Sequence, residues 1–295
     1  MKSTVAVLIL LSACLFVRAA EGESKPDRVA LWPEGQAPNG DGTKDSANAF
    51  YTLHRPANPN RAALVICPGG GYGGLVTGGE GHGIAAWLNQ HGITGIVLEY
   101  RLPKGRSEVP LLDAGRALRT ARFHAKEWGI DPQRIGIIGF SAGGHLASTA
   151  GTHFDAGDAA SDDPIERQSS RPDFMILIYP VITMDTSTHG GSRKNLLGPD
   201  PTPELVVRFS NEKQVTAQTP PAFLAHAVDD KVVVPANSEA FHAALVKNGV
   251  PGKYLALPSG GHGLNGYKGP MWDAWQKQSL EWLAEIGMVP ATKEP

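Results

Sequence analysis

Cysteine is almost absent from this sequence, which has only Cys14 and Cys67 among its 295 residues. Cys14 lies in a leader-like N-terminal segment, so a chain cleaved behind Ala20 keeps one cysteine and cannot form an internal disulfide. Cys67 ends the apolar run Ala63-Leu64-Val65-Ile66-Cys67, where we expect a small buried side chain. Stability must therefore come from a hydrophobic core, and 41% apolar residues in a chain of this length are enough for one.

An excess of charge is also missing. The sequence has 27 lysines and arginines against 29 aspartates and glutamates, a net charge of -2. This balance gives no reason to expect nucleic acid or an anionic membrane as a partner. The histidines show no metal-ligand spacing, and the acidic stretch 155–163 lacks the pattern of a calcium loop, so we interpret it as solvated. We expect no metal and no cofactor.

Long hydrophobic runs are confined to the N-terminus. Lys2 precedes an apolar stretch at 4–17, and Ala19-Ala20 leads into the polar Glu21-Gly22-Glu23-Ser24. This order is typical of a secretory signal peptide, and the stretch is shorter than the about 20 residues of a membrane span. We predict a signal peptide at 1–20, a secreted or periplasmic protein, and no transmembrane helix. The alternative is lipid anchoring at Cys14 through Leu11-Ser12-Ala13-Cys14, but the apolar run continues past that cysteine.

Beyond an irregular lead-in at 21–50, short apolar runs alternate with segments of helical length. We expect strands at 62–67, 94–100, 134–138, 174–179, 222–227 and 253–257. We expect helices at 83–91, 111–128, 142–149, 238–248 and 271–286. The alternation predicts one α/β domain over residues 21–295, with a doubly wound, mostly parallel sheet that is covered on both faces.

Two longer stretches interrupt this alternation. Residues 152–172 are polar and acidic, and residues 183–221 are mixed in character and separate two expected strands. Insertions of this length in a compact domain are commonly lids or binding loops. We therefore predict a small cap, chiefly from residues 183–221.

The clearest chemical motif is Gly139-Phe140-Ser141-Ala142-Gly143, of the form G-x-S-x-G. It follows an expected strand and precedes an expected helix, which is the setting of a nucleophile elbow. The tight turn raises the hydroxyl of Ser141 above the sheet. A glycine-rich turn without chemistry is the alternative, and further residues argue against it.

A serine hydroxyl becomes a good nucleophile only beside a base that an acid orients. Asp230 follows the strand expected at 222–227. His262 follows the strand expected at 253–257, in the loop Ser259-Gly260-Gly261-His262-Gly263. The chain order Ser, Asp, His is that of this fold. Asp229 competes with Asp230, and we favour Asp230 because the stretch His226–Asp230 matches the pattern H-G-x-x-D. We interpret His145, one helical turn beyond Ser141, as structural.

An oxyanion requires two backbone N–H donors. Ala142 directly follows the nucleophile, and the loop Pro68-Gly69-Gly70-Gly71-Tyr72 follows an early strand. Glycines let the main chain approach a carbonyl closely, so we predict donors at Gly70 or Gly71 and at Ala142.

With these residues laid out, the chain resembles the acetylxylan and feruloyl esterase-like enzymes, α/β-hydrolases related to the hormone-sensitive-lipase group. The resemblance runs from about residue 31 to 282. It rests on Leu31-Trp32-Pro33-Glu34-Gly35, on Cys67-Pro68-Gly69-Gly70-Gly71-Tyr72, on the elbow with Gly144-His145-Leu146-Ala147, and on Gly260-Gly261-His262-Gly263. An extra valine in Asp230-Lys231-Val232-Val233-Val234-Pro235 departs from the usual spacing and weakens the assignment of Asp230.

The resemblance implies a serine carboxylic-ester hydrolase, and export favours an acetylated or feruloylated plant-type saccharide as substrate. Tyr72, His189, Ser192 and Arg193 are candidate contacts to the sugar, with packing in the cap as the alternative for each. The rival functions are an exopeptidase on the same scaffold and a non-catalytic carbohydrate-binding homologue. The acyl group and the oligomeric state stay open.

Overall fold

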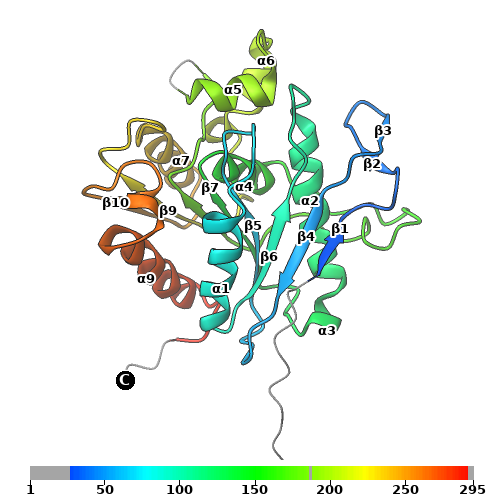
Figure 1. Ribbon diagram of the computed structural model, residues 1–295, viewed down its shortest axis with the longest axis horizontal. Coiled ribbons are helices and arrows are strands. Elements are labelled where there is room, and N and C mark those ends of the chain that lie inside the picture. Colours follow the sequence, from blue (N-terminus) through cyan, green and yellow to red (C-terminus); the bar gives the residue numbers. More distant parts are fainter. Residues whose placement is uncertain (1–26, 186–187, 292–295) are drawn as a thin grey trace, which may run out of the picture.

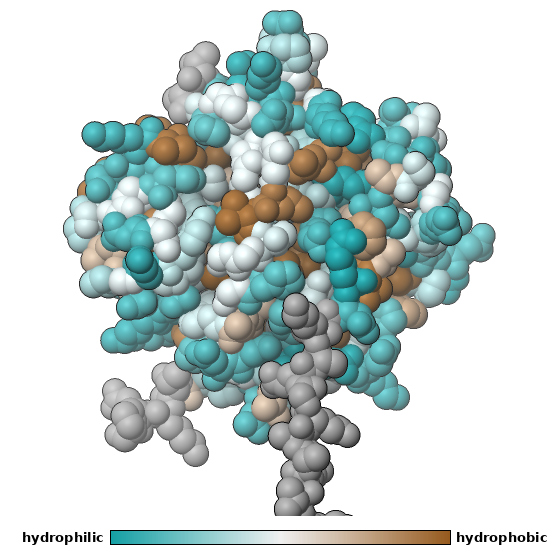
Figure 2. All heavy atoms as spheres, viewed as in Figure 1, coloured by the Kyte–Doolittle hydropathy of each residue, from teal (hydrophilic) through white to brown (hydrophobic). Residues whose placement is uncertain are grey.

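The structure is a computed structural model, in which residues 27–185 and 188–291 are described. The expected signal peptide at 1–20 and the alternative lipid anchor at Cys14 lie outside these residues. In the described part of the chain, no helix combines the length and the apolar character that crossing a bilayer requires. On the face drawn in Figure 2, apolar residues form separate patches among hydrophilic ones.

The core of the described chain is a twisted sheet in the order β1-β4-β6-β5-β7-β8-β9-β10 (Figure 1). The six strands from β6 to β10 in this order are parallel, whereas β1 and β4 form an antiparallel edge. The strand bounds are β1 Arg28–Ala30, β4 Phe50–His54, β5 Ala63–Cys67, β6 Thr94–Glu99, β7 Ile135–Phe140, β8 Met175–Ile178, β9 Ala222–Ala227 and β10 Gly252–Leu257. The mostly parallel sheet is confirmed.

Helices cover both faces of the sheet, as Figure 1 shows. Helices α1 (Gly83–Gln90) and α9 (Pro270–Glu285) pack on one face. Helices α2 (Glu108–Phe123), α3 (Ala125–Trp128), α4 (Ala142–Thr152) and α7 (Ala236–Lys247) pack on the other. The remaining elements are α5 (Gly190–Leu197), α6 (Pro203–Arg208), α8 (Leu264–Tyr267), the π-helix η1 (Gly78–His82) and the 3-10 helix η2 (Asn211–Lys213).

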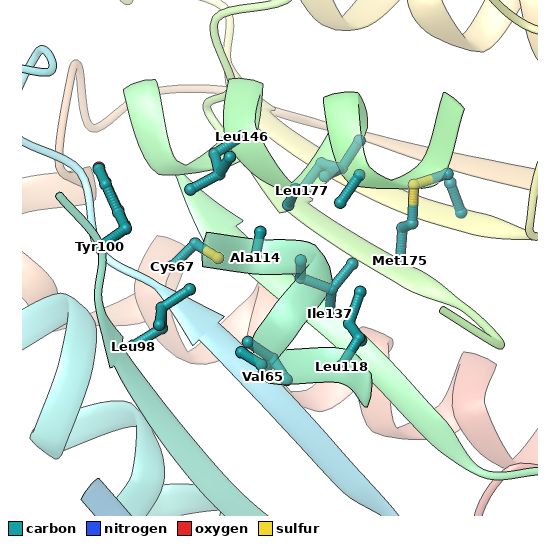
Figure 3. Close-up of a cluster of buried hydrophobic side chains, with 14 of the residues drawn as sticks. Val65, Cys67, Leu98, Tyr100, Ala114, Leu118, Ile137, Leu146, Met175 and Leu177 are labelled. Atoms are coloured by element: carbon teal, nitrogen blue, oxygen red, sulfur yellow. The ribbon is translucent and has the colours of Figure 1, made fainter. Parts of the chain in front are cut away.

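Alternate residues of each central strand point to opposite faces and build two apolar cores. Val65 and Cys67 contribute to the core under α2 and α4, while Leu64 and Ile66 contribute to the core under α1 and α9. Figure 3 shows the first core, where Cys67 lies among Leu98, Leu146 and other apolar side chains. Burial raises the pKa of the Cys67 thiol, which agrees with its expected packing role.

The order of the strands decides where loops can meet. After β5 the chain moves outward to β6 and then returns to β7 on the other side of β5. The loops that follow β5 and β7 therefore leave the sheet in opposite directions and open a crevice between them, which is where α/β sheets bind ligands. The register pairs Cys67 with Gly139. The loop Pro68–Tyr72, called the glycine loop below, and the elbow therefore begin side by side.

The expectation of an irregular lead-in is wrong. Within it, Arg28–Ala30 forms edge strand β1 against β4, and β2 (Ala37–Pro38) pairs with β3 (Lys44–Asp45). Strands of two or three residues are too short to show a periodic pattern. Residues 152–172 are held against α2 by ion pairs from Arg116 and Arg119, and their part in a cap stays a prediction.

The N-terminal segment is held to α2 by a buried ion pair. Asp113, which has no exposed side-chain surface, accepts hydrogen bonds from the guanidinium and the backbone N–H of Arg101, at 2.7 to 3.1 Å. The indole of Trp32 donates to the same carboxylate at 2.7 Å, and Arg101 also donates to the carbonyl of Pro38. Removing one member of such a pair leaves the other buried and unpaired, which costs more than the pair itself contributes.

We therefore expect Asp113→Ala to lower the free energy of unfolding by about 3 to 5 kcal/mol. The matched control is Glu281→Gln, because Glu281 pairs with Lys277 at the surface, where both side chains are largely exposed. That variant should change stability by less than about 0.5 kcal/mol. Urea unfolding of the three proteins measures the difference, and equal effects of the two substitutions would contradict this account.

Candidate active site

Ser141 occupies the turn between β7 and α4 with an unusual backbone conformation. Its φ of 52° and ψ of -118° lie in a region that non-glycine residues rarely adopt. Backbone hydrogen bonds fix this conformation: the N–H of Ser141 donates to Ile178, and its carbonyl accepts from Val181 and His145. Such strain persists only where its surroundings hold it, and it is a common feature of functional sites.

The two glycines of the elbow, Gly139 and Gly143, are required because neighbouring backbone segments leave no room for a side chain there. A methyl group on Gly139 would overlap the carbonyl of Gly143, and one on Gly143 would overlap the carbonyl of Cys67. The second overlap involves the end of β5. Glycine at position 143 therefore lets the start of α4 lie directly against the glycine loop.

The structure brings His262 and Asp230 to Ser141 from loops far away in the chain. His262 Nε2 lies 2.9 Å from Ser141 Oγ, and His262 Nδ1 lies 2.7 Å from Asp230 Oδ2. With Nδ1–H donating to the carboxylate, Nε2 is free to accept the proton of the hydroxyl. The imidazole is 23% exposed and the carboxylate is buried, so a ligand can reach the base but not the acid.

The neighbouring aspartates have separate tasks in this geometry. Asp230 faces the imidazole, and its Oδ1 accepts the backbone N–H groups of Val232 and Val233. Asp229 instead accepts the N–H groups of Gly260 and Gly261, at 3.3 and 2.8 Å. The extra valine in this segment does not displace Asp230, and Asp229 stabilises the loop that carries His262.

Sequence reasoning missed the contribution of His226. This histidine is buried and lies 3.3 Å from Asp230 Oδ2, the oxygen that also meets His262. Its Nε2–H donates to the carbonyl of Val233, and its Nδ1 accepts from the hydroxyl of Ser238. Burial alone would raise the pKa of Asp230, but hydrogen bonds from His226 and His262 outweigh it and hold that pKa below its ordinary value. The spacing H-x-x-x-D was the available signal.

The glycine loop lies next to the nucleophile. A Cβ placed on Gly69 would be 3.1 Å from Cβ of Ser141. The loop then turns through three residues of positive φ, which are Gly70 at 129°, Gly71 at 63° and Tyr72 at 59°. Among the hydrogen bonds of the described residues, the N–H groups of Gly70 and Gly71 have no acceptor, which leaves them available to a ligand.

Among the candidate sugar contacts outside the glycine loop, His189 comes close to Gly71. A Cβ on Gly71 would be 3.8 Å from His189 Cε1. Burial and the nearby His262 lower the pKa of His189. Its Nδ1 accepts the N–H of Ser192, so the neutral ring carries its proton on Nε2. Arg193 is partly buried, and its Nε has no hydrogen-bond partner among the described residues.

The other two candidates are corrected. The side chain of Tyr72 is buried, and its hydroxyl donates to Nδ1 of His145 at 2.8 Å. Ser192 is also buried, and its Oγ lies 2.9 Å from Nδ1 of His189. Neither hydroxyl is available to a saccharide. His145 has the structural role expected of it, because its Nε2–H donates to the carbonyl of Phe209.

Two surface hollows of about 450 and 610 Å³ lie away from Ser141 and His262. The first is lined by residues of α2, of the adjoining 153–170 stretch and of the N-terminal segment, and the second by residues of α6 and its surroundings. Within residues 27–185 and 188–291, no group of three or more histidine, cysteine, aspartate or glutamate side chains is arranged to hold a metal ion. The reactive groups that the structure brings together are the hydroxyl of Ser141, the imidazole of His262 and the carboxylate of Asp230.

Known proteins resemble this chain in sequence and in fold. The BD-FAE family matches residues 53–245, a segment that contains the glycine loop, the elbow and Asp230. The chain belongs to the BD-FAE family. Among curated relatives of this BD-FAE chain, an acetylxylan esterase of Xylanibacter ruminicola is 36% identical over 85% of the chain, and endo-1,4-beta-xylanase B of Butyrivibrio fibrisolvens is 36% identical over 77% of it. The chain spans only 50% and 36% of the lengths of these two relatives.

Solved structures of similar fold include an acetyl ester-xyloside bifunctional hydrolase from Caldicellulosiruptor lactoaceticus. It is 40% identical, has a TM-score of 0.84, and the match covers 90% of this chain and 98% of that one. A carboxylesterase from Lactobacillus plantarum is 23% identical with a TM-score of 0.73, over 91% of this chain and 100% of that one. The α/β-hydrolase fold is thus confirmed for this BD-FAE member.

The separate tasks of the two aspartates predict different effects of the same substitution. Asp230→Asn should slow labelling of Ser141 by a fluorophosphonate about 10³- to 10⁴-fold, because the amide no longer holds the required tautomer of His262. Asp229→Asn should slow it by less than about tenfold, because one amide oxygen still accepts from the N–H of Gly261 in the loop that carries His262. Labelling rates of the two variants test this, and a larger effect at position 229 would exchange the assignments.

His145 predicts a pH dependence of stability. Burial lowers its pKa to about 4 from an ordinary value of 6.5, so the unfolded chain binds a proton more readily than the folded one. Its contribution is complete above pH 6.5 and is lost as the pH falls toward 4. We expect the wild type to lose about 2 to 3 kcal/mol more stability than His145→Gln between pH 7 and pH 4.5. Urea unfolding at both pH values measures this, and equal losses would assign the pH dependence to other groups.

Proposed function

We propose that this BD-FAE member is a serine carboxylic-ester hydrolase that removes acetyl or feruloyl groups from plant-type polysaccharide or oligosaccharide. The single observation that carries the proposal is the unbroken chain of contacts Ser141–His262–Asp230, with steps of 2.9 and 2.7 Å. The N–H groups of Gly70 and Gly71, which have no acceptor among the described residues, belong to the loop next to Ser141. The names of the two similar proteins, an acetylxylan esterase and an acetyl ester-xyloside hydrolase, support the substrate class.

In the proposed first step, His262 Nε2 takes the proton of Ser141 as Oγ attacks the ester carbonyl. A tetrahedral intermediate forms, and its oxyanion is bound by the N–H groups of Ala142 and of Gly70 or Gly71. Each such donor stabilises the transition state by about 3 kcal/mol. The positive charge that develops on the imidazole lies next to Asp230, which keeps its negative charge because its pKa is lowered.

Collapse of this intermediate breaks the bond to the sugar oxygen, which takes the proton of His262, and the acyl group stays on Ser141 as an ester. In the second step water attacks this acyl-enzyme with His262 again as the base. The bond to Ser141 Oγ then breaks, Oγ regains its proton from His262, and acetate or ferulate leaves. In this proposal His189 donates its Nε2–H to a sugar oxygen, which the acceptance of Ser192 N–H by its Nδ1 supports, and residues 183–221 form the cap that carries it.

Export to the medium or the periplasm is part of the proposal. The N-terminal segment at 1–20 has the composition of a signal peptide, and a polysaccharide is too large to be imported. Mass determination of the protein recovered outside the cell tests this, and a chain that begins behind residue 20 is the expected product.

The defining experiment is turnover of p-nitrophenyl acetate by wild type and Ser141→Ala. We expect the variant to lose nearly all activity and to keep its melting temperature, since only one hydroxyl oxygen is removed. Ser148→Ala is the matched control and should keep its activity, because Ser148 is a second buried serine, on α4, whose hydroxyl donates to the carbonyl of His145 and accepts from the side-chain amide of Asn211. Release of acetate and ferulate from acetylated xylan and feruloylated arabinoxylan then identifies the substrate. Full activity in Ser141→Ala would refute the proposal.

A further inference from the structure

Glu80 is a buried carboxylate beneath the candidate active site, and the chemistry described so far does not use it. It lies in the π-helix η1, and 3% of its surface is exposed. Isolated π-helical turns are rare and frequently occur at functional sites. In the described part of the chain, no lysine or arginine forms an ion pair with Glu80. Burying a carboxylate without a cation is costly.

Two hydrogen-bond donors offset part of this cost. The N–H of Gly69 donates to Oε2 at 2.7 Å, and the hydroxyl of Tyr179 donates to Oε1 at 2.9 Å. Burial raises the pKa of Glu80, while these donors, Tyr267 and the nearby His262 oppose the rise. Because both groups donate, the site suits an acceptor-only carboxylate.

These partners come from different parts of the candidate active site. Gly69 lies in the glycine loop, and Tyr179 follows β8. Tyr267, at the end of the loop that carries His262, packs its ring on η1, where a Cβ on Gly79 would be 2.7 Å from Tyr267 Cδ2. The ring of Tyr179 packs edge-on against the imidazole of His262, with centroids 5.0 Å apart. Glu80 therefore links the glycine loop to the loop of the base.

The contact at Gly69 is the most direct link to the reacting atoms. A Cβ at this position would be 2.6 Å from Glu80 Oε2 and 3.1 Å from Cβ of Ser141. Gly69 thus lies between the carboxylate and the nucleophile, and only a residue without a side chain fits there. The carboxylate fixes the direction of the peptide unit that joins Pro68 to Gly69, one unit before the one that carries the N–H of Gly70.

We propose that Glu80 is a positioning residue, which holds Gly69 so that the N–H groups of Gly70 and Gly71 point at the oxyanion above Ser141. This inference rests on the proposed ester hydrolysis. Glu80 itself touches neither the substrate nor the transferred proton. Its effect should therefore appear in the transition state and not in the binding of the ground state.

Two conservative substitutions distinguish the length of the side chain at position 80 from its negative charge. Glu80→Asp keeps the charge but withdraws the carboxylate by one methylene, so Gly69 loses its acceptor. Glu80→Gln keeps the length, and its amide oxygen can still accept from Gly69. The experiment measures kcat and KM for p-nitrophenyl acetate per titrated serine, the melting temperature, and inhibition by a trifluoromethyl ketone that forms a tetrahedral adduct.

We expect kcat of Glu80→Asp to fall about 10- to 100-fold with KM within about threefold of wild type, by analogy with the loss of an oxyanion donor. Inhibition by the trifluoromethyl ketone should weaken in parallel, and Glu80→Gln should lose less activity than Glu80→Asp. Glu212→Gln is the control, because Glu212 is a partly buried glutamate on η2 whose Oε2 has no hydrogen-bond partner among the described residues. It should keep the wild-type kcat.

Three results would overturn the proposal. They are a kcat of Glu80→Asp within twofold of wild type, a change confined to KM or to the melting temperature, and a greater loss in Glu80→Gln than in Glu80→Asp. Turnover by wild type but not by Ser141→Ala establishes ester hydrolysis independently of these variants. A wild type without turnover refutes the proposed function itself, whereas an active wild type with an equally active Glu80→Asp refutes only the role of Glu80.

Discussion

The active site depends on the close approach of two turns at the carboxyl ends of β5 and β7. Gly143 allows the start of α4 to lie against the carbonyl of Cys67, and Gly69 allows the glycine loop to lie against Ser141. Side chains at either position would force the two segments apart. Because the contact is between backbones, it varies little with rotamer state, and the nucleophile and the N–H groups beside it are arranged before a ligand arrives. Such preorganisation is the main source of electrostatic stabilisation in enzymes.

Buried polar groups maintain this arrangement from below. His226 and His262 share one oxygen of Asp230, and His145 holds the hydroxyl of Tyr72 at the end of the glycine loop. Each of these groups is costly to bury, and each has hydrogen-bond partners that offset the cost. Positive φ angles at Ser141 and Tyr179, of 52° and 38°, add backbone strain at the same place. The surrounding sheet, which is buried on both faces, is rigid enough to impose that strain.

The candidate site combines residues fixed by the sheet with residues on a long connection. Ser141, Asp230 and His262 follow strands, whereas His189 and Arg193, the remaining candidate contacts to a sugar, lie in the connection between β8 and β9. Connections can change in length and sequence without altering the sheet. A solved structure that is only 23% identical to this chain shares its fold. Fold and family thus imply the chemistry more firmly than they imply the sugar.

The sequence by itself determined the alternation of the six parallel strands with the main helices, the elbow around Ser141 and the loop positions of Asp230 and His262. These features are local, because periodicity, a five-residue turn and the residue that follows a strand are all written in neighbouring positions. Only the tertiary structure decided that Asp230 and not Asp229 faces the imidazole, that Tyr72 and Ser192 are buried, and that Glu80 and His226 support the site. Glu80 and Tyr179 are 99 residues apart in the chain, and the packing of the sheet and its loops, which no local pattern encodes, brings them together.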